Sequence, residues 1–311
     1  MTASFALRRI LQMVSTLAFI LILTFLLVRL LPGDPLAAIA GDKATDAQIL
    51  QARAEHGLDQ PLGVQFLSYI YRTATGDLGD SIAARVPVSA LLAERLPPTL
   101  LLTVMAVGIG LVLTVPLAVI AALKRDRAAD IAIRSVFQVG LSMPAFYLGL
   151  VILTIFAAQL RWFPVGGYGD GWGEHLYRLF LPALTLGISL AAMVMRNLRG
   201  AIIDVLDAEY VTFARAKGLS PTIIVVHHVL RNALISTVAL LGPIIGSLLG
   251  GAVITESVFA IPGVGRLMID SIYGRDYPVI QGLTLIIAMV VSLVFLLTDL
   301  IQAALDPRLS R

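Results

Sequence analysis

The sequence predicts an all-α polytopic membrane protein, and three observations support this class. Of its 311 residues, 58% are hydrophobic and only 14% are charged, whereas soluble domains carry about 25% charged residues. The apolar residues form blocks of about 20, the length that a helix needs to span a bilayer. The lysines and arginines are concentrated at the edges of these blocks. Together these features indicate several membrane-spanning helices.

Six stretches are long and apolar enough to span the membrane: residues 10–28, 99–123, 135–160, 179–195, 233–254 and 279–297. The first follows Arg8 and Arg9, as the apolar part of a signal peptide would. Its apolar run is too long for a signal peptide, however, and the small-residue box at residues 38–40 lies well past its end. We therefore expect a retained first helix. Because no internal repeat stands out, we expect one transmembrane domain over residues 1–311.

The positive charges predict the orientation of these helices, because cytoplasmic loops are enriched in Lys and Arg. Thirteen lie on the side that includes both ends of the chain. The short connections on the other side hold only Arg161, Arg178, Arg266 and Arg275. Six more lie in the long first connection, which translocates largely regardless of charge. Both termini are therefore expected in the cytoplasm.

The first connection, residues 32–96, is expected to be an extracytoplasmic loop with helices of its own. Thr45 and Gln48 have the spacing of a capping box. Pro61 can open a second helix, which would end before Gly76. The loop is either a lid packed on the membrane helices or a docking surface for a substrate-delivery protein, and the residues leave both interpretations open.

A polar segment, residues 196–232, separates the fourth and fifth apolar stretches and is expected in the cytoplasm. Asp204, Asp207 and Glu209 lie early in a predicted helix, and Arg215 and Lys217 lie at its end. This order of charges suits the helix macrodipole. The segment therefore predicts a short, stable helix outside the membrane.

A tight turn is predicted after this helix. Gly218 can adopt the left-handed conformation that ends a helix. Ser220 is a good N-cap, and Pro221 fits the first position of the next helix. We therefore expect two short helices joined at Gly218 and Leu219.

Tyr210, Phe213, Ala214 and Lys217 fall on one stripe of the first of these helices. Such a stripe can enter a groove on another protein. It can equally lie on the bilayer surface or pack on neighbouring spans. The stripe alone does not distinguish these interpretations.

Two features within the apolar stretches are candidates to line a pathway through the membrane or to pack helices together. Pro144, after Ser142 and Met143, predicts a kink in the third stretch, and Gln138, Ser142 and Met143 are candidates to approach a pathway if the kink is more than a packing feature. In the fifth stretch, Gly242, Gly246 and Gly250 recur every four residues. Glycines at this spacing let helices approach closely, either within the chain or across a pore to a second subunit.

Several activities lack the residues that they need. The expected spans carry almost no charge inside, whereas ion-coupled carriers need ionisable groups there. The sequence contains no Gly-Lys pair, so it has no phosphate-binding P-loop. It has no cysteine, and none of its four histidines lies in an expected span. No metal site is expected, since the adjacent His227 and His228 diverge by about 100° on a helix. A self-sufficient channel or carrier and an intramembrane enzyme remain the alternatives to a passive subunit of a larger transporter.

The polar segment carries a family resemblance. Residues 214–220 (Ala-Arg-Ala-Lys-Gly-Leu-Ser) and 228–234 (His-Val-Leu-Arg-Asn-Ala-Leu) resemble the cytoplasmic coupling loop of ABC-importer permeases. The chain has Thr212-Phe213-Ala214 where the general pattern has Glu-Ala-Ala, and Arg231 where it has proline. Further segments resemble the dipeptide/oligopeptide (and nickel) permeases in their first-subunit form, so that the match extends over essentially the whole chain: residues 31–35, 57–61, 76–79, 94–97, 142–144, 250–253, 262–266, 275–279 and 305–308.

This resemblance implies the type I ABC-importer permease fold in a bacterial inner membrane, and a subunit that is not an enzyme itself. It implies four kinds of partner besides membrane lipid: a second homologous permease, two ATP-binding subunits that hold ATP and Mg, and an extracytoplasmic substrate-binding protein. No nucleic acid is expected. The implied cargo is di- or oligopeptides, with nickel chelates, glutathione or oligosaccharides as alternatives. The residues expected to contact the ATP-binding subunits are Glu209, Tyr210, Phe213, Ala214, Arg215, Lys217, Gly218, Leu219, Ser220 and Arg231.

Overall fold

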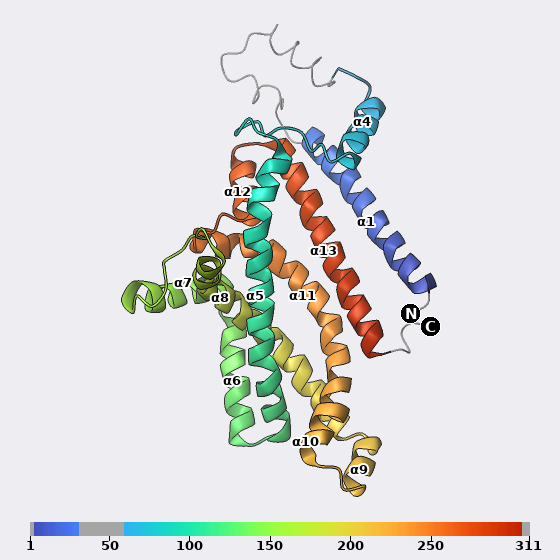
Figure 1. Ribbon diagram of the computed structural model, residues 1–311, viewed down its shortest axis with the longest axis vertical. Helices are drawn as coiled ribbons and strands as arrows, with labels where there is room; N and C mark the ends of the chain where they lie inside the picture. Colours follow the sequence, from blue (N-terminus) through green and yellow to red (C-terminus); the bar gives the residue numbers. More distant parts are fainter. Residues whose placement is uncertain (1–2, 31–58, 307–311) are drawn as a thin grey trace.

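The computed structural model describes residues 3–30 and 59–306, and this part of the chain is almost entirely helical. The helix predicted around Thr45 and Gln48 lies outside the described residues. The elements, labelled as in Figure 1, are α1 (Ala3–Leu30), α4 (Leu62–Ala74), α5 (Val88–Leu123), α6 (Ala128–Ser142), α7 (Ala145–Ile152), η1 (Leu153–Gln159), α8 (Trp172–Leu206), α9 (Glu209–Ala216), α10 (Pro221–Ile223), η2 (Ile224–Leu230), α11 (Arg231–Val258), α12 (Val264–Tyr273) and α13 (Tyr277–Leu305).

Within residues 3–30 and 59–306, five helices are long and apolar enough to cross a membrane, and a bent pair makes a sixth candidate. The five are α1, α5, α8, the continuous helix that begins at Pro221, and α13. The bent pair corrects the expectation of one span over residues 135–160. Its first arm, α6, begins at Ala128, and its second arm, α7 with η1, turns away by 105°. Met143 adopts an extended conformation between the arms (φ −86°, ψ 132°), because the proline after it disfavours a helical conformation.

The centre of the bundle is formed by α5 and α8, which lie side by side through small residues. A Cβ atom on Gly110 would lie 2.6 Å from Cδ2 of Leu190 and 3.0 Å from the carbonyl oxygen of Gly187. A Cβ on Gly187 would lie 3.0 Å from the carbonyl oxygen of Ala106. Helices in lipid associate largely through such close packing, so these two glycines bring the backbones of α5 and α8 together.

Helices α1 and α13 pair in opposite directions. Near the start of α1, Nη1 of Arg9 lies 3.0 Å from Oδ2 of Asp299. Near its end, Nε2 of Gln281 donates to the carbonyl oxygen of Thr24 at 3.0 Å. The beginning of α1 and the end of α13 therefore lie toward the same end of the molecule as α9, called here the α9 end (Figure 1). Helices α4 and α12 lie at the opposite end, the α12 end. Helix α4 confirms the helix predicted after Pro61, which is its N-cap.

Two buried carboxylates hold the α12 end together. Glu256 is fully buried and accepts hydrogen bonds from the Thr99 hydroxyl and from the backbone N–H of Arg266, at the start of α12. Asp276 accepts from the hydroxyl of Ser81 and from the backbone N–H of Ile82, at 3.1 Å for the latter. Glu256 therefore fixes the start of α12 to α5, and Asp276 fixes the loop at residues 81–82 to the start of α13.

Candidate functional site

The polar segment at the α9 end begins with a change of direction at Ala208. Helix α8 ends at Leu206 with Asp207 as its C-cap, Ala208 is extended (ψ 142°), and α9 then begins at Glu209. Asp204 and Asp207 thus belong to α8 and its cap, contrary to the expectation that they open the short helix. Glu209 in the first turn of α9 and Arg215 in its last turn keep the predicted order of charges.

The turn after α9 has the predicted local geometry. Gly218 has a φ of +76°, and its N–H donates to the carbonyl oxygen of Arg215 at 2.9 Å. The Ser220 hydroxyl accepts from the N–H of Ile223 at 3.4 Å, and Pro221 opens the next helix. The expectation of a second short helix is wrong, because α10, η2 and α11 continue as one helix. Neither proline nor glycine stands between them, and η2, a stretch of π-helix, joins α10 to α11 without a break.

One side of α9 is fixed to the rest of the protein. Val211 and Ala214 are buried in the same apolar cluster as Ile224 and Val229 of the following helix. The side chain of Asn232 also donates to the Tyr210 hydroxyl at 3.0 Å. The short helix is therefore fixed to the beginning of the long helix that starts at Pro221.

The other side of α9 and its turn is an exposed surface, called here the α9 face. The side chain of Phe213 is 68% exposed. No carboxylate in the described part of the chain lies within 4 Å of the cationic groups of Arg215 or Lys217. The predicted stripe is corrected here, because Ala214 faces inward while its neighbours face outward. The α9 face comprises Phe213, Arg215, Lys217, Leu219 and Ile223, with Tyr210 at its edge, where the Tyr210 hydroxyl also accepts from Asn232.

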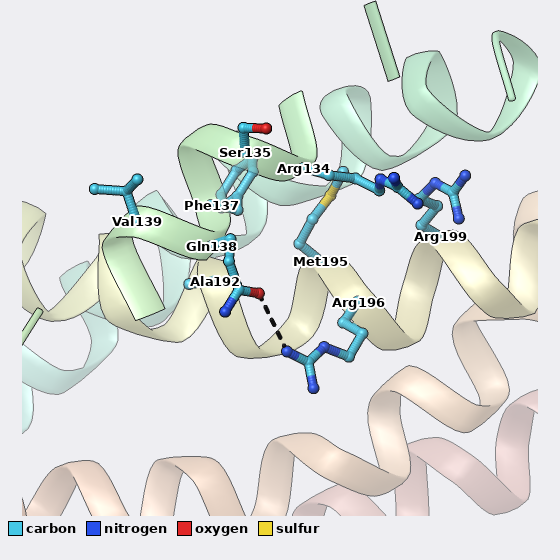
Figure 2. A pocket seen from close by; sticks show the side chains of 9 residues that line it. All are labelled: Arg134, Ser135, Phe137, Gln138, Val139, Ala192, Met195, Arg196 and Arg199. Atoms are coloured by element: carbon cyan, nitrogen blue, oxygen red, sulfur yellow. Dashed lines mark hydrogen bonds between the residues drawn. The ribbon is translucent and has the colours of Figure 1, made fainter. Parts of the chain in front are cut away.

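A groove of about 620 Å³ opens between α6 and α8 (Figure 2). Of the three candidates for the pathway, only Gln138 lines it. Ser142 donates instead to the backbone oxygen of Gln138 at 2.9 Å, within its own helix, and Met143 is the residue at the break. The residues that line the groove are Arg134, Ser135, Phe137, Gln138, Val139, Ala192, Met195, Arg196 and Arg199.

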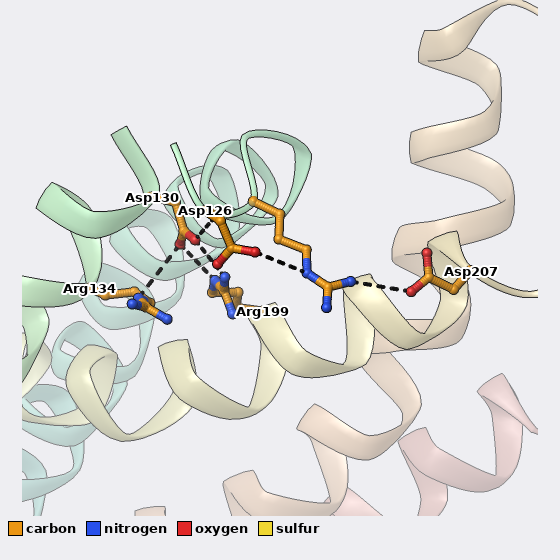
Figure 3. A network of polar contacts seen from close by, with 6 residues as sticks. Asp126, Asp130, Arg134, Arg199 and Asp207 are labelled. Atoms are coloured by element: carbon orange, nitrogen blue, oxygen red, sulfur yellow. Dashed lines mark hydrogen bonds and ion pairs between the residues drawn. The ribbon is translucent and has the colours of Figure 1, made fainter. Parts of the chain in front are cut away.

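A network of ion pairs at one end of the groove connects α6 to α8, and two of its arginines, Arg134 and Arg199, also line the groove (Figure 3). The buried carboxylate of Asp130 accepts from Nε of Arg199 at 2.7 Å and lies 3.9 Å from Nε of Arg134. It also accepts from the backbone N–H of Asp126 at 2.9 Å. The sequence interpretation missed this pair. Its one local signal is that Asp130 is the third residue of α6, where an acidic side chain reaches back to free N–H groups.

The three glycines of α11 differ in their surroundings. A Cβ on Gly242 would lie 2.9 Å from Oγ1 of Thr298, and one on Gly246 would lie 3.3 Å from Cγ1 of Val291. Both positions therefore face α13 of the same chain. Among the described residues, no atom of another element lies within 4 Å of a Cβ placed on Gly250, which leaves that position open to another surface.

Two family models match the chain. The model for the binding-protein-dependent transport system inner membrane component matches residues 114–311. The model for the N-terminal part of such membrane components matches residues 2–103.

The chain is also similar to curated proteins and to solved structures. The glutathione transport system permease protein GsiC from Salmonella choleraesuis (strain SC-B67) is 42% identical over 305 residues, which cover 98% of each chain. GsiC from Escherichia coli (strain K12) is 41% identical over the same coverage. An inward-facing structure of the MetNI methionine ABC transporter aligns with a TM-score of 0.59 at 19% identity, covering 70% of this chain and 96% of that one. At this identity the structural match supports the fold alone.

Proposed function

The chain belongs to the family of binding-protein-dependent transport system inner membrane components, and it is a multi-pass permease subunit of an ABC importer in the inner membrane. From this premise we propose that it carries short peptides through a pore. We propose further that a separate ATPase drives this pore by contacting the α9 face. Transport permeases of this family are not enzymes themselves. The sequence has no Gly-Lys pair that would form a P-loop. ATP and Mg are therefore proposed to bind to separate subunits.

The observation that carries the coupling proposal is the contrast between the two sides of α9. Its inner side is fixed to the start of the long membrane helix through Val211, Ala214 and the Tyr210–Asn232 hydrogen bond. Its outer side exposes Phe213 beside Arg215 and Lys217. An aromatic side chain with arginine nearby is typical of protein interfaces. A partner that grips the α9 face can therefore move the membrane helix directly.

The proposed assembly contains this chain, a second homologous permease, two ATP-binding subunits and an extracytoplasmic substrate-binding protein. The α9 end is placed in the cytoplasm, because most lysines and arginines of the short connections lie at that end. Both termini then lie in the cytoplasm as well. The loop over residues 32–96 and the α12 end face the binding protein.

The proposed cargo is a peptide of two or three residues. The relatives at 41% and 42% identity are permeases of glutathione transport systems, and glutathione is a tripeptide. We therefore propose glutathione and peptides of similar size ahead of nickel chelates and oligosaccharides.

Reconstitution in liposomes tests this proposal. The chain would be expressed with the ATPase, second-permease and binding-protein genes that neighbour its own, and uptake of radiolabelled glutathione and of the dipeptide Ala-Phe would be measured. We expect ATP-dependent uptake by the whole assembly and none by the chain alone. Uphill transport by the isolated chain would contradict the proposal, as would an assembly that forms but hydrolyses ATP without peptide uptake.

A further inference from the structure

The groove between α6 and α8 has an uncompensated positive charge. Three arginines line it, and no acidic residue does. The carboxylate of Asp130 accepts from Arg199 at 2.7 Å and lies 3.9 Å from Nε of Arg134. Arg196 donates to the side-chain oxygen of Gln138 at 3.3 Å (Figure 2). No carboxylate in the described part of the chain lies within 4 Å of the Arg196 guanidinium.

Arg134 and Arg196 lie next to the cytoplasmic ends of two expected spans, residues 135–160 and 179–195. Arg196 belongs to the candidate span Trp172–Leu206, and α6 is the first arm of the bent span. A charge at this edge is tolerated where it reaches water, a lipid headgroup or a bound anion. An arginine without an acidic partner is therefore a candidate for binding an anion that passes through.

Short polar side chains beside the groove indicate whether this surface faces water or hydrocarbon. From the groove, a polar strip continues through Asn197, whose side-chain oxygen accepts from the Ser236 hydroxyl at 3.4 Å. One turn along α11 from Ser236, Asn232 donates to Tyr210 of α9. Arginine can extend its charged group to lipid headgroups, but the side chains of asparagine and serine are too short to do so. The strip is therefore expected to face water or a second subunit rather than hydrocarbon.

The size and composition of the groove suit a small peptide with a free carboxylate. Pockets for small ligands range from about 300 to 1,000 Å³, and this groove measures about 620 Å³. Guanidinium groups match carboxylates in geometry and can donate two parallel hydrogen bonds. Phe137, Val139 and Met195 provide apolar surface beside the arginines.

We propose that the groove between α6 and α8 is an anion-binding subsite of the translocation pathway, in which Arg196, with Arg134 beside it, binds the carboxylate of the transported peptide. This inference rests on the proposed function, because it requires that the cargo be a peptide. The same chemistry would bind the phosphate of an anionic lipid, so the experiment separates the two sources. The polar strip favours the peptide.

Because the chain contains no cysteine, a single introduced thiol can be labelled specifically to test this proposal. Ser135 lines the groove, and Ser135→Cys places one thiol there in this subunit. The whole assembly would be prepared in discs of neutral phosphatidylcholine, and ATP-driven uptake measured first in liposomes. The thiol would then be labelled, without ATP, by anionic or cationic methanethiosulfonate reagents and read by intact mass of the subunit. The charge variant is Arg196→Gln, and the matched control is Arg127→Gln, an exposed arginine at the start of α6 that does not line the groove.

We expect the anionic reagent to react about fivefold faster than the cationic one, because the local potential concentrates anions. Arg196→Gln should remove this preference, and Arg127→Gln should retain it. Ala-Phe, or S-methylglutathione if glutathione is the cargo found, should slow labelling about fivefold at saturation. The amidated peptide should not protect, and neither peptide should protect the Arg196→Gln variant.

Other outcomes overturn the proposal. They are a thiol that does not react, equal rates for both reagents, or equal protection by peptide and amide. Protection that appears only with phosphatidylglycerol in the disc and ignores the peptide would show that the groove holds a lipid phosphate. If the assembled transporter shows no ATP-driven peptide uptake, the proposed function itself fails. If uptake is normal and protection is absent, only the groove assignment fails.

Discussion

The two ends of the molecule use charged side chains in opposite ways. At the α12 end, the carboxylate of Glu256 is fully buried and accepts hydrogen bonds from Thr99 and Arg266. At the α9 end, Arg215 and Lys217 point outward and have no acidic partner within 4 Å in the described residues. A buried carboxyl group with satisfied hydrogen bonds fixes one arrangement of helices, whereas an exposed, unpaired charge is available to another protein. The first end is therefore built to hold its shape, and the second to be gripped.

The largest expected effect is at the α12 end. Glu256→Ala should lower the free energy of unfolding by about 2–4 kcal/mol, because buried donors of Thr99 and Arg266 lose their acceptor. Glu256→Gln keeps the volume and one acceptor oxygen and should cost less. The measurement is the midpoint of thermal unfolding in detergent, followed by tryptophan fluorescence.

The matched control for this change is Glu94→Ala, because the Glu94 side chain is 66% exposed. It should change the unfolding free energy by less than about 0.5 kcal/mol. Equal midpoints for Glu256→Ala and Glu94→Ala would show that the buried carboxylate does not hold α12 in place.

The second effect is at the α9 end, where Gly218 has a φ of +76°. Gly218→Val should introduce about 1–2 kcal/mol of strain, because β-branched residues clash in the left-handed conformation. We expect at least tenfold less peptide uptake per ATP hydrolysed, with normal insertion into the membrane. Gly200→Val is the matched control, since Gly200 is helical and has open space around its Cβ position. Normal coupling in Gly218→Val would contradict the role assigned to this turn.

Local chemistry made the α9 turn predictable from the sequence. A glycine after a charged helix, followed shortly by serine and proline, determines the backbone angles of the turn without contacts to distant residues. The apolar stretches likewise predicted the membrane helices, since length and composition decide them. Pro144 predicted a kink, but the 105° angle depends on what packs against both arms. Predictions that depended on nearby residues therefore succeeded for the turn and the membrane helices, whereas the start of α9 and the second short helix were predicted wrongly.

Contacts between distant residues could not be read in this way. Thr99 and Glu256 are 157 positions apart, and Asp130 and Arg199 are 69 apart. Nothing in either local pattern identifies the partner. The inward orientation of Ala214 could not be predicted either, because it depends on where Ile224 and Val229 of the next helix lie. The groove depends on the pairing of α6 with α8, so its three arginines were seen in the sequence only as a signal for orientation.

A smaller effect should separate the exposed aromatic residues of the two ends. Phe213→Ala removes the most exposed apolar side chain of the α9 face and should weaken binding of the ATP-binding subunits about tenfold. Tyr273→Ala at the α12 end is the control, because Tyr273 is 86% exposed but lies away from the α9 face. Binding would be measured by titrating purified ATPase onto the immobilised permease. Equal loss in both variants would remove the distinction between the ends.

The smallest effect is expected for an exposed ion pair near the α12 end, where Nε of Arg72 lies 2.8 Å from Oδ2 of Asp77. The hydrogen bond from Arg72, helped by one from the backbone N–H of Gly79, lowers the pKa of Asp77 below its ordinary value of 3.8. Its stabilising contribution is therefore present above pH 3.8 and is lost as the pH falls through the lowered pKa. Since both side chains are about half exposed, Asp77→Asn should cost less than about 0.5 kcal/mol at pH 7.

This last difference should shrink when the unfolding midpoints of Asp77→Asn and the unaltered chain are compared at progressively lower pH. Added salt should shrink it at pH 7 as well, because exposed charges are screened. A difference that grows on acidification would have the wrong sign for a carboxylate with a lowered pKa. A loss at pH 7 as large as that of Glu256→Ala would show that burial is not what separates structural carboxylates from surface carboxylates at this end of the molecule.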